Sequence, residues 1–109
     1  MEQREGERKG RVSFVTTMRE VVSTPGEILL EEFLEPLGIS QYRLAWAIQK
    51  PQSAISDIVN GRRSITPEMA CLLGRALGTT AQFWLNLEMT YQLKLLEARG
   101  VPDVDVLVE

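Results

Sequence analysis

Residues 52–67 of this chain read QSAISDIVNGRRSITP, and this stretch decides the fold. It begins with Ile55, Ile58 and Val59 at the spacing of one helical face, and the helix is expected to stop at Gly61. The opposite face carries four short hydrogen-bonding side chains, which are Gln52, Ser53, Ser56 and Asp57. A helix that packs on one side and offers such groups on the other is suited to contact base edges in the major groove of DNA.

An ordinary solvent-facing surface is the alternative interpretation of these four residues. Asp57 fits a base contact least readily, because it must accept a hydrogen bond from cytosine or else lie unfavourably close to phosphate. Four more residues around this helix suit contacts to phosphate, which position a protein on DNA without reading its sequence. These are Gln41, Asn60, Arg62 and Arg63. For the two arginines the alternative is a solvated loop, with Gly61 serving only to end the helix.

Capping residues and apolar periodicity predict four further helices around this one. The five predicted helices cover about Pro25 to Glu35, Ser40 to Gln49, Pro51 to Asn60, Thr66 to Leu77, and Thr79 or Thr80 to Gly100. Gln82 is placed for a capping box at the start of the last helix. The expected fold class is therefore all-α.

Length and composition indicate one globular domain of 109 residues, of which 44% are apolar and 25% are charged. No apolar run approaches the roughly 20 residues of a membrane span, and the charged first eleven residues do not resemble a secretory signal. A single cysteine suits a reducing cytoplasm, the expected location. Without histidine, Cys/His zinc sites and histidine-based catalytic triads are excluded, so we expect no enzyme, metal or cofactor.

Three segments are expected along the chain. Residues 1–21 are predicted to be a flexible extension, because the first eleven are mostly charged and lack an apolar anchor. Residues 22–100 form the helical domain. In the tail, residues 101–109, Val104 and Val106 alternate with acidic residues, which weakly indicates a short strand. Such a strand either pairs with its own copy across a dimer or does not form.

The charge distribution is compatible with a nucleic-acid partner although the whole chain has a net charge of −3. Between residues 40 and 63 the basic residues are Arg43, Lys50, Arg62 and Arg63, and Asp57 is the only acid, giving a local balance of +3. Local fields attract phosphate, whereas the charge of the whole chain mainly sets solubility.

The last predicted helix is apolar nearly all round, and a helix of this kind is covered on more than one side. In so small a protein, a second subunit is the expected cover, which predicts a homodimer. The dimer-interface candidates are Trp84, Leu87, Tyr91 and Leu95. Trp84 is also compatible with a place in the core.

Several motifs together resemble the Xre-type, lambda-repressor-like helix-turn-helix fold, and more narrowly the HigA-type (VapI-like) antitoxins of bacterial toxin–antitoxin operons. The motifs carrying the resemblance are Pro25-Gly26-Glu27, Leu44-Ala45, Ile55-Ser56-Asp57-Ile58, Asn60-Gly61-Arg62-Arg63, Ile65-Thr66 and Phe83-Trp84-Leu85-Asn86-Leu87. The resemblance covers about residues 22–96. It departs at Gln49, where the family usually has glycine and where a left-handed backbone costs a side chain about 1 kcal/mol, so we expect a reshaped turn.

The resemblance implies a five-helix DNA-binding antitoxin that neutralises a small basic RelE-like ribonuclease toxin and represses its own operon. An acidic ridge of Glu27, Glu31 and Glu35, together with the aromatic residue Trp46, supplies weak candidates for toxin binding. A solvated helix face explains the ridge equally simply. Two other functions stay open, namely a stand-alone repressor and a toxin-binding protein whose degenerate helix-turn-helix no longer binds DNA.

Overall fold

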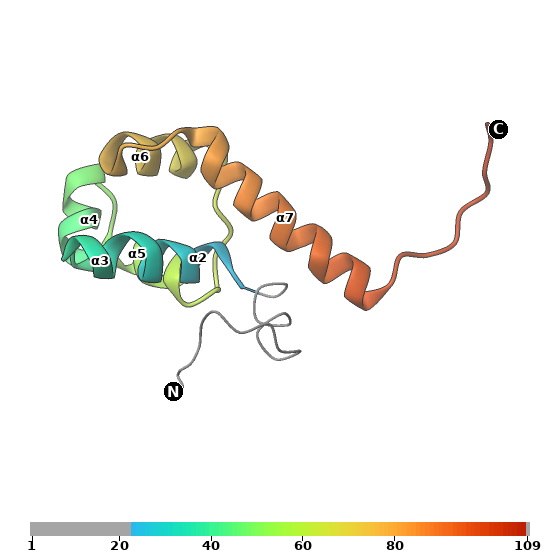
Figure 1. The fold of residues 1–109 in the computed structure, drawn as a ribbon, viewed down its shortest axis with the longest axis horizontal. Helices are drawn as coiled ribbons and strands as arrows, with labels where there is room; N and C mark the ends of the chain where they lie inside the picture. Colours follow the sequence, from blue (N-terminus) through green and yellow to red (C-terminus); the bar gives the residue numbers. More distant parts are fainter. Residues whose placement is uncertain (1–22, 109) are drawn as a thin grey trace.

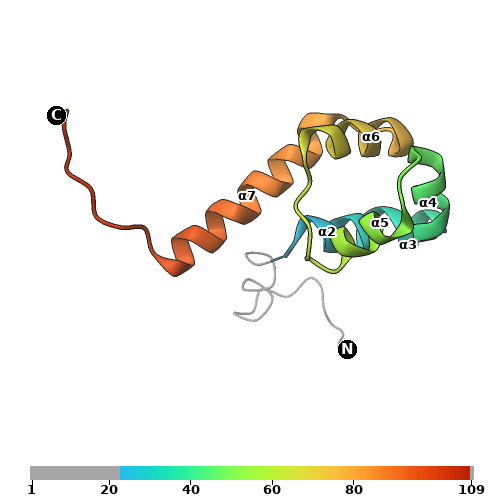
Figure 2. The same cartoon turned by 180° about the vertical axis from the view of Figure 1, so that it is seen from behind.

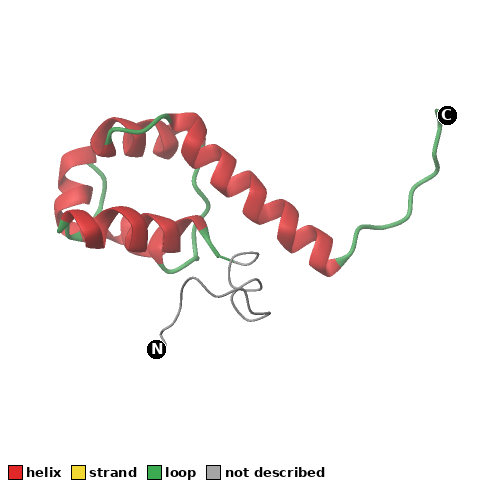
Figure 3. Cartoon of the chain, viewed as in Figure 1, coloured by secondary structure: helices red, strands yellow, loops and turns green. Residues whose placement is uncertain are grey.

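The computed structural model describes residues 23–108, and all the regular structure in this part of the chain is helical (Figure 3). The elements are α2 (Pro25–Ile28), η1 (Leu29–Leu34), α3 (Glu35–Leu37), α4 (Gln41–Ile48), α5 (Gln52–Val59), α6 (Pro67–Leu77) and α7 (Ala81–Arg99). The first three are successive segments of one helix, so the described residues form five helices, and the all-α prediction is confirmed. The predicted flexible extension, residues 1–21, lies outside the described residues.

Hydroxyl caps begin four of the five helices. The side chains of Thr24, Ser40, Thr66 and Thr80 each accept a hydrogen bond from the backbone N–H three residues later. These caps satisfy donors that have no partner inside a helix. The capping box predicted for Gln82 was wrong, because Thr80 is the N-cap and the third residue of the helix is Phe83, whose backbone N–H donates to Thr80 Oγ1 over 3.0 Å.

The first helix extends past the predicted end at Glu35 and stops at Gly38, whose φ of 68° is left-handed. Its middle part, η1, is a wider π-helical turn. Pro36 lies two residues after this turn. It has no N–H to give to an i−4 carbonyl, and its ring would collide with that carbonyl in a regular α-helix. The wider turn lets the helix continue through the proline.

The turn between α4 and α5 keeps the left-handed geometry at Gln49, with φ 60° and ψ 45°. The expectation of a reshaped turn was therefore wrong. Gln49 is the only residue other than glycine with positive φ among residues 23–108. The backbone accepts the strain because Lys50 N donates to Ala45 O over 3.0 Å and Gln49 N donates to Trp46 O over 3.2 Å, which closes the end of α4.

A single core lies between the helices, and its fully buried large side chains are Leu29, Leu34, Leu44, Ile55, Ile58, Leu73 and Trp84. The Trp84 ring lies 5.0 Å from the rings of both Phe33 and Phe83, measured between centroids. Its indole N–H donates to Thr79 Oγ1 over 2.7 Å, so its one polar atom is satisfied.

The helices α2 and α5 approach each other closely at Gly26. A Cβ atom built at this position would lie 1.8 Å from the carbonyl oxygen of Ile58. Backbone cannot yield to such an overlap, so only glycine fits. The contact fixes the C-terminal half of α5 against the first helix, which also contacts α7.

The last helix, α7, packs its N-terminal half against the domain and extends beyond the other helices in its C-terminal half (Figures 1 and 2). The tail that follows, residues 101–108, is exposed and forms no strand, so the weakly indicated strand is absent from the described chain. Among the helices of residues 23–108, none combines the length and the hydropathy needed to cross a bilayer.

Candidate nucleic-acid interface

The helices α4 and α5 form a helix-turn-helix, joined through the tight turn at Gln49. Ile55 and Ile58 fill the core side of α5 and are almost completely buried, which orients the opposite side of the helix outward. This orientation follows from the apolar spacing, because residues three apart share one face. The outward side is the one that carries the predicted base-contacting residues.

Gln52 and Ser53 occupy the first turn of α5, and both are exposed. Neither side chain forms a hydrogen bond with any residue of the described chain, so their donors and acceptors are open to a ligand. The helix begins after Pro51 without a side-chain cap, which leaves its first N–H groups open as well. Uncapped N–H groups at a helix start favour an anion such as phosphate.

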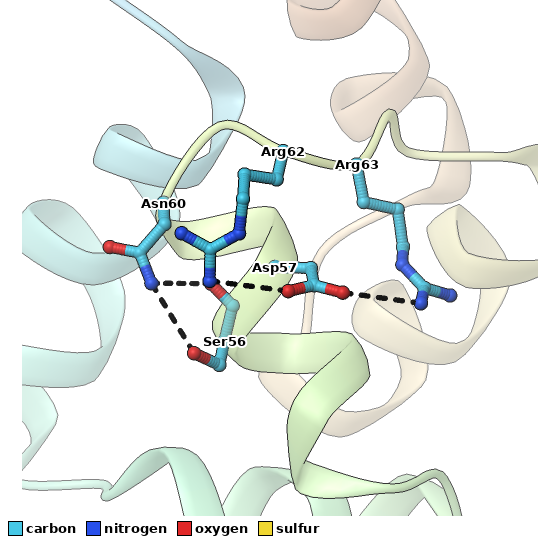
Figure 4. Close-up of polar contacts among 5 residues, drawn as sticks. All are labelled: Ser56, Asp57, Asn60, Arg62 and Arg63. Atoms are coloured by element: carbon cyan, nitrogen blue, oxygen red, sulfur yellow. Dashed lines mark hydrogen bonds and ion pairs between the residues drawn. The ribbon is translucent and has the colours of Figure 1, made fainter.

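Ser56 and Asn60 are joined across the last turn of the same helix. The Asn60 amide nitrogen donates to the Ser56 carbonyl oxygen over 2.8 Å and lies 3.3 Å from Ser56 Oγ (Figure 4). The pair orients the Asn60 side chain back over the helix. A predicted base contact and a predicted phosphate contact thus share one local network.

Asp57 brings together the two arginines of the loop after α5. Its Oδ1 lies 3.3 Å from Arg62 Nη2 and its Oδ2 lies 3.4 Å from Arg63 Nη2, one arginine on each oxygen (Figure 4). The Asp57 carbonyl also accepts from Arg62 N over 2.7 Å, in the backbone arrangement that left-handed Gly61 permits. The structure therefore gives Asp57 a local partner set that the sequence pattern did not indicate.

Lys50 and Glu68 form a second charge pair beside the start of α5. Lys50 Nζ lies 3.2 Å from Glu68 Oε2, and both residues line a shallow hollow together with Ser53 and Arg63. Lys50 is absent from the predicted site, although its position directly before Pro51 was a usable signal. No pattern in the sequence relates it to Glu68, which is eighteen residues away on α6.

The start of α4 carries the remaining phosphate candidate, Gln41, which is half-buried. Tyr42 and Trp46 lie one turn apart on the same helix and are exposed, Trp46 to 67%. The guanidinium of Arg43 lies 5.6 Å from the Trp46 ring centre, within reach of a cation–π contact. The first helix does not cover these aromatic residues, and the other cover considered for them, residues 12–22, lies outside the described chain.

The three glutamates of the predicted acidic ridge differ in exposure and in hydrogen bonding. The Glu27 carboxylate accepts from Thr24 N over 3.1 Å in a capping box, so it is committed to the helix start. Glu31 and Glu35 are exposed. The ridge is therefore most exposed at the latter two residues, whereas Glu27 is half-buried.

The dimer candidates separate into buried and exposed residues. Trp84 is 0% exposed and packs inside the domain, so its expected place at a subunit interface is corrected to the core. Leu87 and Tyr91 are half-buried, and Leu95 is partly exposed. Met89 and Leu93 were not among the candidates, yet both are more exposed than Leu95. They belong to the side of α7 that the domain leaves uncovered.

Glu88 is an acidic residue on α7 that the sequence pattern did not single out. It is 6% exposed, and its Oε1 accepts from Ile65 N over 2.9 Å while its Oε2 accepts from Gln92 Nε2 over 2.7 Å. The carboxylate thereby fixes the segment that follows Arg62 and Arg63 to α7. Residues 23–108 contain no group of three or more Asp, Glu, Cys or His placed to hold a metal ion.

Comparison with known proteins gives concordant matches. A family described as Helix-turn-helix matches residues 30–84. Virulence-associated protein I of Dichelobacter nodosus is 47% identical over 73 residues, covering 67% of this chain and 68% of the relative. Antitoxin HigA-1 of Vibrio cholerae is 42% identical over 77 residues, which is 71% of each protein. The structure of Pseudomonas aeruginosa antitoxin HigA with the higBA promoter is 42% identical, with a TM-score of 0.69 over 72% of this chain and 85% of that one.

Proposed function

Because the chain belongs to the Xre-type helix-turn-helix family whose members include the HigA antitoxins, we propose that it is a DNA-binding antitoxin. In this function it binds an operator in duplex DNA and represses its own operon. It also neutralises a small basic ribonuclease toxin of the RelE-like class. The two activities use different surfaces of the molecule.

The observation that carries the DNA-binding activity is the open first turn of α5. Gln52 and Ser53 project from an exposed helix start with no hydrogen-bond partner in the described chain. Side-chain amides and hydroxyls in this position are the groups that read base edges in the major groove. The relative from Pseudomonas aeruginosa, whose structure includes promoter DNA, shares this fold.

Contacts to the DNA backbone are assigned to the residues around this helix. Arg62 and Arg63 lie in the loop after α5. Gln41 is the first residue of α4, and Asn60 is the residue at which α5 ends. Lys50 joins them because its ammonium lies beside the same helix start. Such contacts fix the register of the recognition helix on the duplex and supply most of the salt-dependent affinity.

A homodimer completes the proposed binding unit. The uncovered side of α7 presents Met89, Leu93 and Leu95, with Leu93 58% exposed. Together with Leu96 they line one hollow of α7, and exposed apolar surface gathered in this way supports an interface. Two copies related by a two-fold axis place their recognition helices about 34–36 Å apart, one turn of DNA, on a palindromic operator.

The toxin surface is assigned to the first helix, on the exposed carboxylates of Glu31 and Glu35, with Trp46 as a second candidate contact. A ribonuclease that binds RNA carries positive charge, so acidic residues on the antitoxin favour its encounter. This assignment rests on the antitoxin family and on charge complementarity. It leaves the outward face of α5 free for DNA.

A fragment-capture experiment tests the proposal as a whole. Sheared genomic DNA of the source organism is incubated with the protein at moderate salt, and bound fragments are challenged with random competitor DNA. We expect one enriched fragment that overlaps the promoter of the protein's own operon, next to a gene for a small basic protein. Enrichment without such a neighbour favours a stand-alone repressor. Toxin binding without any enriched fragment favours a degenerate helix-turn-helix.

A further inference from the structure

We propose that Asp57 and Glu68 are internal counter-ions that compete with DNA phosphates for Arg62, Arg63 and Lys50. By occupying these cations in the free protein, the two carboxylates weaken binding to DNA of any sequence. The inference rests on the proposed DNA-binding function and assigns an affinity-lowering role to two acidic residues within it.

The geometry of Asp57 is the first observation. Its two carboxylate oxygens lie 3.3 and 3.4 Å from the guanidinium groups of Arg62 and Arg63, so one acid engages both loop arginines at once (Figure 4). These are the two cations nearest the end of the recognition helix. In the free protein, a phosphate approaching either arginine meets a carboxylate already in place.

Two electrostatic effects disfavour a negative charge at the position of Asp57. It lies in the last turn of α5, where the helix dipole disfavours negative charge. It also lies on the outward side of a helix proposed to enter DNA, where phosphates repel a carboxylate. The arginine pairs offset these effects, but exposed ion pairs add little to folding stability. Stability alone therefore does not account for an acid here.

Lys50 and Glu68 repeat the arrangement at the other end of the helix. The ammonium lies 3.2 Å from the carboxylate, although the two residues come from different elements. Three of the four basic side chains between residues 40 and 68 are thus paired with acids, and the fourth, Arg43, lies over the Trp46 ring. The two carboxylates thus offset half of the four positive charges that the sequence concentrates here.

The ion pairs affect binding to both random and operator DNA. Binding to random DNA depends almost entirely on cations that contact phosphate, so every cation withheld by a carboxylate weakens it. Operator binding adds base contacts from the open first turn of α5, which do not depend on these ion pairs. Internal counter-ions therefore subtract a similar free energy from both complexes, and the operator complex keeps the part that its base contacts supply.

The test compares Asp57→Asn with the wild-type protein on random and on operator duplex over a range of salt concentrations. The substitution keeps the shape of the side chain and removes its charge. At low salt we expect Asp57→Asn to bind random DNA about fivefold more tightly, the effect of one charge contact at close range in water. The dependence of affinity on salt should become steeper, because more cations then contact phosphate. Operator affinity should rise by a similar factor, so that the ratio of the two stays near its wild-type value.

Two further variants separate the local effect from a change in total charge. Glu97→Gln removes one negative charge from the exposed part of α7 and should leave random-DNA affinity near the wild-type value. Glu68→Gln should act like Asp57→Asn but less strongly, since the Glu68 side chain is more exposed than that of Asp57.

The outcomes are distinct. Unchanged random-DNA affinity in Asp57→Asn, or an equal gain in Glu97→Gln, overturns the counter-ion role. A loss confined to the operator also overturns it and assigns Asp57 to base contact instead. Failure of the wild-type protein to distinguish operator from random DNA would contradict the proposed function. The random-DNA measurements need no operator, so they would still report on the counter-ion role in that case.

Discussion

The carboxylate of Glu88 on α7 accepts a hydrogen bond from the backbone nitrogen of Ile65 over 2.9 Å, and both residues are buried. This bond ties the long C-terminal helix to the segment that leaves the arginine loop. It joins the part of the molecule proposed to dimerise to the part proposed to bind DNA.

Replacement of Glu88 by alanine should destabilise the domain by about 1–3 kcal/mol, because it leaves the buried Ile65 N–H without a partner. Glu88→Gln keeps an acceptor oxygen and should cost less. Glu97→Ala, an exposed position on the same helix, is the matched control. Urea unfolding of the three variants measures the difference. Equal stability of Glu88→Ala and Glu97→Ala would show that the bond contributes nothing.

The left-handed backbone at Gln49 predicts that Gln49→Gly is stabilising. Relief of the left-handed strain contributes about 1–2 kcal/mol, and the greater freedom of glycine in the unfolded chain offsets about 0.4–1 kcal/mol of it. Gln49→Ala keeps the Cβ atom and should show no such gain. Thermal unfolding compares the two variants. A Gln49→Gly variant less stable than wild type would show that the left-handed backbone at Gln49 costs no folding free energy.

Most of the fold was predictable because helix boundaries are encoded locally. Thr24, Ser40 and Thr66 cap helices that begin within about one residue of their predicted starts, and Gly38 and Gly78 end two of them in left-handed conformations. The π-helical turn of η1 was not predictable in this way, since the leucine spacing suits regular and widened turns alike. The left-handed turn at Gln49 was not expected, because its backbone hydrogen bonds to the end of α4 hold a conformation that a side chain disfavours.

The candidate interface was predictable to a smaller extent. The apolar spacing of α5 determined which side of the helix faces outward, and the structure places Gln52 and Ser53 there. Pairings between elements have no period in the sequence, so the Lys50–Glu68 pair and the burial of Glu88 were missed. Trp84 was ambiguous because an aromatic residue suits a core and an interface equally well.

The proposed dimer predicts that Leu93→Asp shifts the protein to a monomeric mass in sedimentation at tens of micromolar. The substitution introduces a charge into the apolar side of α7 that the domain leaves uncovered. Glu97→Asp on the same helix is the control and should not change the mass. A separate truncation after Gly100 asks whether the tail contributes. A wild-type protein that sediments as a monomer would contradict the dimer.

The proposed toxin surface predicts that Glu31→Lys combined with Glu35→Lys slows toxin association and leaves operator binding intact. Charge reversal removes the attraction that speeds encounter with a basic partner, so the effect should diminish with added salt. Glu27 is left unchanged because its carboxylate caps the helix. Reversal of Asp103 and Asp105 in the exposed tail is the matched control. If the double variant Glu31→Lys, Glu35→Lys associates with the toxin at the wild-type rate, the ridge is a solvated helix face that does not contact the toxin.

The most direct test of the central claim is to measure the affinities of Gln52→Ala and Arg62→Ala for operator and random DNA. Gln52→Ala should lose about 1–3 kcal/mol on the operator and little on random duplex, because its amide is assigned to a base edge. Arg62→Ala should weaken both similarly and reduce the salt slope by about one. Equal losses on both DNAs for Gln52→Ala, or no loss on either, would contradict sequence reading by the first turn of α5.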